Sequence, residues 1–166
     1  MTAQTGIDPR GPRFGAAITA VLLLVVIGLS LGGLLVPALI IFGAQTLLFA
    51  WGAFAGIQRH PYGLLFKKLV RPRLKPPAEL EVPTPPTFAQ GVGFAITAIG
   101  VILTLLGLTL ALPIAAALAF VAAFLNSVFG YCLGCQIYLL LVRLRGPRRV
   151  GSWPTQAKQP PSGSAI

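Results

Sequence analysis

The chain carries two cysteines, and they stand close together in the segment Cys132-Leu133-Gly134-Cys135. This spacing places two sulfur atoms one helical turn apart, or within reach of a disulfide bond where the first residues form a turn. Such a pair can cycle between dithiol and disulfide, carry sulfur as a persulfide, or supply two ligands to a soft metal. Passive packing is the remaining interpretation, because cysteine is small and apolar. We take Cys132 and Cys135 as the candidate catalytic residues.

Four further side chains are candidates for the same site: His60, Gln136, Tyr131 and Asn126. No metal is predicted, because zinc takes four protein ligands in structural sites and three in catalytic sites. His60 is the single histidine of the chain and the one further good ligand for such a metal. No cofactor is predicted either, since the sequence has no glycine-rich phosphate loop.

The composition indicates a membrane protein. Hydrophobic residues make up 55% of the 166 residues, and only 10% are charged, against about 25% charged in a typical soluble domain. The formal net charge of +10 would suggest nucleic acid as a partner of a soluble chain. Here the 13 Lys and Arg residues form three blocks beside long uncharged stretches, so we expect a lipid bilayer and no nucleic acid.

The uncharged stretches predict four transmembrane helices. Residues 14–57 and 88–142 are free of charged side chains, and each stretch is long enough for two spans of about 20 residues. Breakers near Pro37 and Pro113 divide them. The predicted fold is therefore an all-α polytopic membrane protein of two hairpins, with spans at about 14–33, 37–57, 88–110 and 113–142.

The basic blocks predict the orientation. The positive-inside rule places the segment 1–13, the loop 58–87 and a disordered tail 146–166 in the cytoplasm of a cell whose plasma membrane holds the helices. Within the loop, residues 62–70 have the apolar spacing of a short interfacial helix. The span 113–142 is too long for the bilayer, so it either projects into the cytoplasm or breaks at Gly130 or Gly134. Both cysteines then lie near the cytoplasmic leaflet.

The two halves of the sequence look related. Residues 17–21 (Ala-Ile-Thr-Ala-Val) return as 95–99 (Ala-Ile-Thr-Ala-Ile), and 69–71 (Leu-Val-Arg) return as 141–143. Chance similarity between apolar helices is the alternative. A true repeat would relate two hairpins of the same orientation by a pseudo-twofold axis along the membrane normal. Pairs such as Gly28 and Gly32, with small-xxx-small spacing, predict close helix packing.

Four segments in order carry motifs that occur together: 7–14 (Ile-Asp-Pro-Arg-Gly-Pro-Arg-Phe), 60–66 (His-Pro-Tyr-Gly-Leu-Leu-Phe), 77–81 (Pro-Ala-Glu-Leu-Glu) and 129–135 (Phe-Gly-Tyr-Cys-Leu-Gly-Cys). Over residues 7–145 the chain thereby resembles the domain of unknown function 4395 family, integral membrane proteins of actinobacterial type. The family brings no assigned activity. Its members tend to occur beside genes for thioredoxin-like and rhodanese-like proteins, which implies thiol or sulfur handling with such a cytoplasmic partner.

The chain departs from the family pattern at two positions. Gln136 stands where members often have an acid after the second cysteine, and Val82 stands where an acid often precedes the position of Pro83. An acid–base role for position 136 is therefore not carried over.

Three hypotheses follow for the function. The first is a membrane thiol-redox or sulfur-relay protein that uses Cys132 and Cys135, with the two sulfur atoms in disulfide range. The second is a permease for a small solute, with a polar cavity reached by Gln45, Thr46 or Asn126. The third is a non-catalytic scaffold that recruits a cytoplasmic enzyme through residues 60–86. The oligomeric state stays open.

Overall fold

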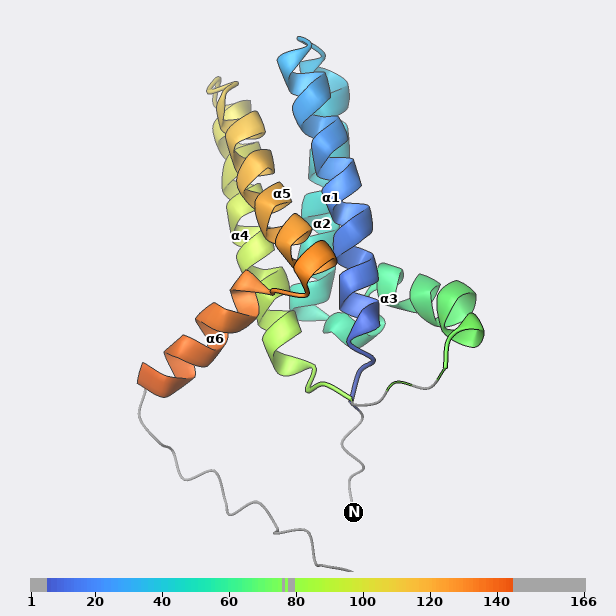
Figure 1. Ribbon diagram of the computed structural model, residues 1–166. Coiled ribbons are helices and arrows are strands. Elements are labelled where there is room, and N and C mark those ends of the chain that lie inside the picture. Colours follow the sequence, from blue (N-terminus) through green and yellow to red (C-terminus); the bar gives the residue numbers. More distant parts are fainter. Residues whose placement is uncertain (1–5, 76, 78–79, 145–166) are drawn as a thin grey trace, which may run out of the picture.

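The computed structural model describes residues 6–75, 77 and 80–144, and every regular element in them is a helix (Figure 1). The predicted tail 146–166 and residues 1–5 lie outside the described residues. Four helices are long, namely α1 (Arg10–Leu31), α2 (Leu35–Phe54), α4 (Thr84–Leu105) and α5 (Ala111–Phe129). Shorter elements follow α2 and α5: η1 (Ile57–Arg59), α3 (Pro61–Leu65), η2 (Phe66–Val70), η3 (Arg71–Arg73) and α6 (Leu133–Leu144).

The four long helices are apolar and long enough to cross a membrane, which confirms the predicted all-α polytopic fold. Large hydrophobic side chains cover their outer surfaces. Val36 is 69% exposed, Leu47 is 71% exposed and Leu105 is 68% exposed. Surfaces of this kind are stable in a bilayer, because lipid chains are as apolar as the side chains they contact.

The two ends of the bundle differ in charge. The turns between α1 and α2 and between α4 and α5 lie at one end, and α3 and α6 lie at the other (Figure 1). Every Lys and Arg among the described residues belongs to a segment at this second end, which we call the basic end; these residues are Arg10, Arg13, Arg59, Lys67, Lys68, Arg71, Arg73, Lys75 and Arg143.

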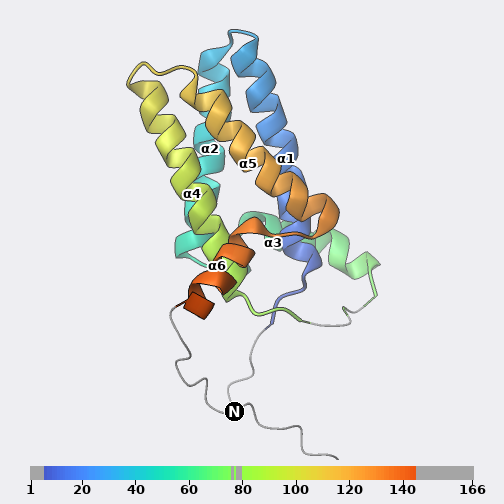
Figure 2. The ribbon, with the colours of Figure 1, turned by 60° about the vertical axis from the view of Figure 1, so that its left-hand side comes forward.

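The predicted long span 113–142 is two helices. Gly130 ends α5 with the left-handed backbone angle φ 68°, which glycine adopts without steric cost. Three residues later, at Leu133, α6 starts in a new direction and lies across α4 (Figure 2). The contact is close, because a Cβ atom at Gly134 would lie 2.5 Å from the Cβ atom of Ala89. Of the two breaks considered from the sequence, the one at Gly130 is present.

The two halves of the chain correspond element by element. α1 and α4 have the same length, and α4 begins and ends 74 residues after α1. Gly33 and Gly107, in the two turns, both have positive φ and are also 74 residues apart; Gly56 and Gly130 repeat this relationship at the ends of α2 and α5. The related sequences at 17–21 and 95–99 are 78 residues apart, which exceeds the spacing of 74 by about one helical turn. They therefore lie on the same face of α1 and α4 but are displaced by one turn along the helix.

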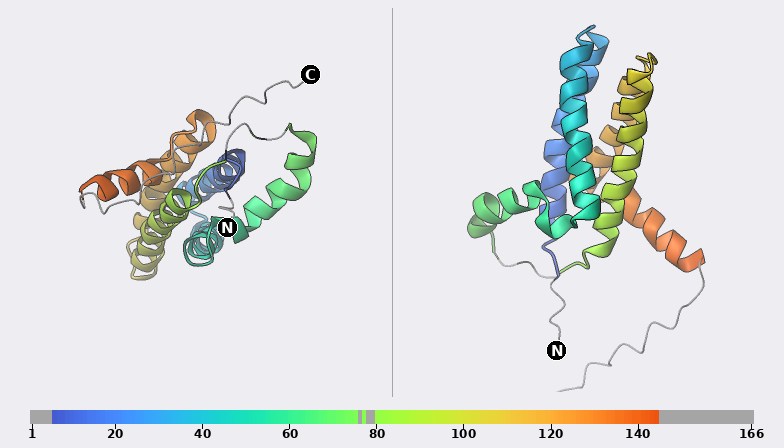
Figure 3. Two further views of the ribbon diagram at one scale, coloured as in Figure 1. Left: turned by 90° about the horizontal axis from the view of Figure 1, so that it is seen from below. Right: turned by 180° about the vertical axis from the view of Figure 1, so that it is seen from behind.

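The helix contacts follow a pseudo-twofold axis. α1 packs mainly on α5, as α4 packs mainly on α2, and the contact of α1 with α3 recurs as that of α4 with α6. At the basic end Ile7 and Glu81, again 74 residues apart, form an antiparallel bridge with two N–H···O bonds of 2.9 Å. Seen from below, the α3–η3 segment and α6 extend to opposite sides of the bundle (Figure 3). This is the arrangement of a parallel repeat.

The apolar core lies toward the turn end of the bundle. Leu23, Phe42 and Leu112 are fully buried there. The absence of a side chain at Gly100 lets the helices meet, since a Cβ atom at this position would lie 2.5 Å from that of Ala115. The basic end is less filled, and it contains the candidate site.

Candidate functional site

Cys132 and Cys135 form a disulfide at the start of α6. Their Cα atoms are 5.2 Å apart, which is normal for a disulfide. Cys132 immediately precedes the helix, and its sulfur accepts a hydrogen bond from the backbone N–H of Cys135 at 3.3 Å. Both residues are half-buried. The sulfur of Cys132 therefore holds the capping position of α6, where unpaired N–H groups and the helix dipole favour negative charge.

A cation lies beside this turn. The guanidinium of Arg13 donates a hydrogen bond to the carbonyl oxygen of Val128 at 3.4 Å. A Cβ atom at Gly130 would lie 3.4 Å from Cζ of Arg13. Arg13 comes from α1 and thus reaches the loop that leads into Cys132. A nearby positive charge favours the thiolate form of a cysteine over the thiol.

His60 holds the corresponding position in the other half. It precedes the first residue of α3, and its Nδ1 accepts a hydrogen bond from the backbone N–H of Tyr62 at 3.3 Å. The side chain is only 4% exposed. Burial lowers the pKa of His60 below its usual 6.5, with the backbone of Leu48 acting in the opposite direction. Its ring is therefore neutral at pH 7, and the proton resides on Nε2 because Nδ1 is an acceptor.

Two buried polar atoms in the described part of the chain lack a hydrogen bond of good geometry, namely Oε1 of Gln90 and Nε2 of His60, whose ring lies near the backbone of Leu48. Both side chains lie over Gly52 of α2. A Cβ atom at Gly52 would be 2.9 Å from Cδ2 of His60 and 2.8 Å from Cγ of Gln90. Buried polar atoms are rarely left unpaired, so these two call for an explanation.

A short polar network holds α3 against the bundle. The amide nitrogen of Gln45 donates to the hydroxyl of Thr19 at 3.2 Å, and the hydroxyl of Tyr62 donates to the amide oxygen of Gln45 at 3.1 Å. Phe66 is buried, and its ring centroid is 5.8 Å from that of Phe14. The network and the ring contact fix the position of His60, two residues before Tyr62.

A cavity of about 1020 Å³ lies between these elements at the basic end. Cys132, Cys135, His60, Gln136 and Asn126 all line it, so it brings together five of the six residues selected from the sequence. Tyr131 does not line this cavity and is exposed. Gln45 and Thr46, expected on the permease hypothesis to reach a cavity, are buried but do not line this one.

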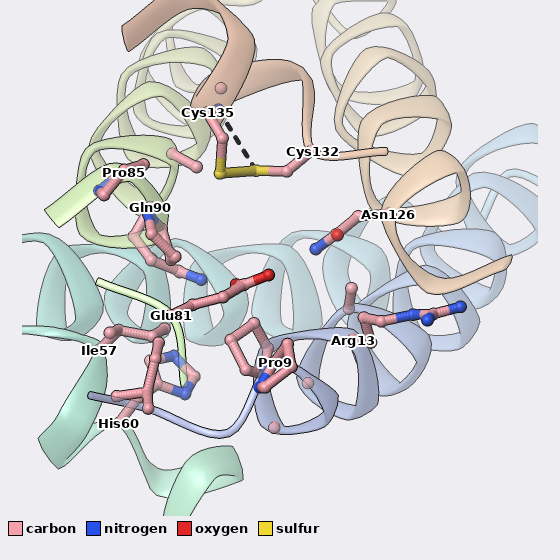
Figure 4. A pocket seen from close by; sticks show the side chains of 18 of the residues that line it. Pro9, Arg13, Ile57, His60, Glu81, Pro85, Gln90, Asn126, Cys132 and Cys135 are labelled. Carbon is pink, nitrogen blue, oxygen red and sulfur yellow. Dashed lines mark hydrogen bonds between the residues drawn. A yellow bond between two sulfur atoms is a disulfide. The ribbon is translucent and has the colours of Figure 1, made fainter. Parts of the chain in front are cut away.

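Sequence reasoning did not select Gln90 as a site residue, nor the charged side chains that line the cavity, which are Asp8, Arg13, Lys67, Arg71 and Glu81. Figure 4 shows the amide groups of Gln90 and Asn126 facing the cavity from α4 and α5, with the carboxylate of Glu81 between them. Of these residues, Gln90 could have been selected from the sequence, because it is the one amide side chain in the predicted span 88–110. Within the described residues no three His, Cys, Asp or Glu side chains are grouped as metal ligands.

The comparisons with known proteins bear on the family of the chain. No curated protein and no solved structure matches it. The family model described as "Domain of unknown function (DUF4395)" matches residues 7–143, which include the cavity, the Cys132–Cys135 pair and both halves of the repeat. On this match the chain belongs to the DUF4395 family.

Proposed function

We propose that the protein is a membrane thiol-redox protein that exchanges disulfides through Cys132 and Cys135. One observation carries the proposal: the two sulfur atoms are bonded to each other at the start of α6, half-buried in the wall of a large cavity. A cysteine at a helix N-terminus beside a cation has the environment of a reactive thiol.

The exchange needs a partner that carries two thiols. A thiolate of the partner attacks the sulfur of Cys132, the Cys132–Cys135 bond breaks, and Cys135 leaves as a thiolate that takes up a proton. The second thiolate of the partner then attacks the partner's own first sulfur, which is bound to Cys132 in the mixed disulfide. The partner leaves with a disulfide, and Cys132 is released as a thiolate. The backbone N–H of Cys135, which already donates to this sulfur, stabilises the charge.

The proposed orientation follows from the charges. With every described Lys and Arg at the basic end, the positive-inside rule directs this end, and with it both termini, to the cytoplasm. We place the protein in the plasma membrane on the same grounds. The cytoplasm keeps most protein thiols reduced, so a disulfide at this end would cycle. A thioredoxin-like or rhodanese-like protein is the kind of cytoplasmic partner that fits.

The test is thiol trapping in intact cells and in inside-out vesicles, with a maleimide that shifts the protein mass, before and after reduction. We expect modification of both cysteines in vesicles only, to an extent that falls after oxidant treatment and recovers after reduction. Cys132→Ser and Cys135→Ser each leave one thiol that stays reactive under oxidant, which controls for access. Thiols that remain unreactive in vesicles, or that stay fully reduced under oxidant, would overturn the proposal and favour the scaffold hypothesis.

A further inference from the structure

The cavity beside the disulfide is lined by charged side chains of both signs, namely Asp8, Arg13, Lys67, Arg71 and Glu81. In the part of the chain that the structure describes there is one ion pair, in which the carboxylate of Asp8 lies 2.9 Å from the guanidinium of Arg10. The other four side chains therefore line the cavity without an oppositely charged partner. An occupant that carries both a cationic and an anionic group would supply such partners.

The acceptor side of the cavity is formed around Glu81. Two backbone N–H···O bonds of 2.9 Å to Ile7 hold this residue, and its carboxylate lies between the amide groups of Gln90 and Asn126 (Figure 4). The amide oxygen of Gln90 is buried without a hydrogen bond. An ammonium group has three N–H donors and no acceptor, so it is the cationic group that fits a carboxylate beside an unpaired amide oxygen.

The donor side of the cavity is the guanidinium of Arg13. It lies against Gly130, two residues before Cys132, and donates one hydrogen bond, to the carbonyl oxygen of Val128 at 3.4 Å. A guanidinium has five N–H donors in a planar fork that matches a carboxylate. Most of the donors of Arg13 are thus available to an anionic group near the disulfide.

We propose that the cavity binds a small disulfide whose halves each carry an ammonium and a carboxylate group, as amino-acid and short peptide disulfides do, and that the reduced Cys132–Cys135 pair reduces it. The ammonium group of one half contacts Glu81 and Gln90, and the carboxylate contacts Arg13. The volume of about 1020 Å³ is near the upper end of the usual range for small-molecule sites, so both halves fit. This inference rests on the proposed thiol function, in which a partner protein supplies the reduced pair.

The electron balance of the step is complete. The thiolate of Cys132 attacks one sulfur of the small disulfide, whose S–S bond breaks, and the first half leaves as a thiolate that takes up a proton. The thiolate of Cys135 then attacks the sulfur of Cys132, and the second half leaves in the same way. The Cys132–Cys135 pair has lost two electrons and two protons, and the small disulfide has gained them as two thiols.

The test uses the purified full chain in detergent, reduced and then freed of reductant without air. The probes are four disulfides with the same sulfur–carbon–carbon skeleton: hydroxyethyl disulfide (neutral), cystamine (ammonium groups), dithiodipropionate (carboxylate groups) and cystine (both groups). Alkylation and mass spectrometry follow the loss of the protein thiols. Each rate is divided by the rate of dithiothreitol with the same disulfide, which removes the intrinsic reactivity of the probe. The ratio of this value to that for hydroxyethyl disulfide, within one protein, is the charge preference.

We expect a charge preference for cystine of about four to twenty-five, a factor of about two to five for each of the two contacts. Glu81→Gln should lower the charge preference about two- to fivefold for cystamine and cystine but not for dithiodipropionate. Arg13→Gln should lower it by a similar factor for dithiodipropionate and cystine but not for cystamine, and any general effect of Arg13 on the thiol of Cys132 cancels in the ratio. Arg59→Gln is the matched control, because it removes the same charge as Arg13→Gln from an exposed side chain that does not line the cavity.

The outcomes separate the two proposals. Thiols that react with hydroxyethyl disulfide but show no charge preference for cystine would overturn the small-disulfide site and leave the thiol function standing. A charge preference that neither Glu81→Gln nor Arg13→Gln lowers, or that Arg59→Gln lowers as much as Arg13→Gln, would also overturn the site. If the thiols react with none of the four disulfides, both proposals fall.

Discussion

His60 and Cys132 are structural counterparts. Each precedes the first residue of the helix that follows the second span of its half, each accepts a backbone N–H at the start of that helix, and both line the same cavity. The two halves thus share one scaffold and differ in the chemistry of this capping position. One half presents a sulfur that can be oxidised, and the other half presents a neutral imidazole. The cavity is lined from both halves, so it brings these two side chains to one space.

The first prediction concerns the reactivity of Cys132. Because its sulfur accepts the N–H of Cys135 and Arg13 lies beside the preceding turn, the thiol of Cys132 in the Cys135→Ser variant should be alkylated faster than the thiol of Cys135 in the Cys132→Ser variant. Adding Arg13→Gln to the Cys135→Ser variant should slow the reaction about two- to fivefold, the range for exposed charge interactions. A time course of alkylation, quenched at intervals and analysed by mass spectrometry, measures these rates.

Arg143 provides the control for this prediction. It lies in the last turn of α6, at the opposite end of that helix from Cys132. Arg143→Gln should leave the alkylation rate unchanged. An equal loss of rate in the Arg143→Gln and Arg13→Gln variants would mean that net charge, and not the position of Arg13, sets the reactivity.

The second prediction concerns pH. Burial lowers the pKa of His60 in the folded protein below 6.5. At pH values between this pKa and that of the unfolded chain, the unfolded chain binds a proton at His60 and the folded chain does not. The free energy of unfolding should therefore fall as the pH drops below about 6.5. His60 is the only histidine, so the decline should be absent in His60→Asn. Thermal unfolding in detergent between pH 7.5 and 5.5 tests this, and an equal decline in both proteins would contradict it.

The third prediction concerns the contact between α6 and α4. A Cβ atom at Gly134 would lie 2.5 Å from Cβ and 2.6 Å from Cα of Ala89, so Gly134→Ala should destabilise the protein by about 1–3 kcal/mol through overpacking. Because the strain has one main partner, Ala89→Gly should restore part of the loss. A double-mutant cycle by thermal unfolding measures the coupling.

Gly28→Ala is the control for the packing prediction. Nothing lies within 4 Å of a Cβ atom at Gly28, and alanine favours a helix over glycine by up to about 1 kcal/mol. The variant should be as stable as the parent or more stable. If Gly134→Ala behaves in the same way as Gly28→Ala, the close approach of α6 to α4 is wrong.

The sequence predicted the four long apolar helices, because a charged side chain is costly in a bilayer and long uncharged stretches are therefore conspicuous. Their bounds differ, since α1 already begins at Arg10 and the predicted span 113–142 is divided into α5 and α6. The sequence also limited the break in the last span to Gly130 or Gly134, and the positive φ of Gly130 decides between them.

The sequence could not predict that α1 packs on α5 and α4 on α2. Small-xxx-small spacing does not name the neighbouring helix. It marked the pairs Gly52–Gly56 and Gly130–Gly134, of which Gly52 and Gly134 are closely packed, but also Gly28, where an added Cβ atom would meet nothing within 4 Å. It did not mark Gly100, which is packed against Ala115.

The same limitation explains the residues of the site. The cysteines, His60 and Asn126 were selected by residue type alone, and type suffices for rare polar residues in an apolar chain. Arg13 was read only as a topology signal, because nothing local shows that α1 lies beside the end of α5. Tyr131 was selected for its nearness to Cys132 in the chain, yet the turn at Gly130 leaves it exposed and outside the cavity.

The last prediction concerns the start of α1. One carboxylate oxygen of Asp8 accepts the backbone N–H of Arg10 at 3.0 Å, and both oxygens accept from its guanidinium at 2.9 Å. The hydrogen bond from the Arg10 side chain holds the pKa of Asp8 below its usual 3.8. Asp8→Ala should therefore cost about 1 kcal/mol at pH 7, the usual value for a lost helix cap.

The pH dependence separates this cap from simple packing. A carboxyl group with a lowered pKa stabilises the fold above its unfolded pKa, and this stabilisation is lost as the pH falls through its folded pKa. The difference in thermal midpoint between parent and Asp8→Ala should thus be full at pH 6 and shrink below pH 4. Asp8→Asn keeps a capping oxygen but no charge, so it should lie between the two at pH 6. A difference that persists unchanged to pH 3 would mean that Asp8 acts through packing, because protonation removes the charge of the carboxylate but not the volume of the side chain.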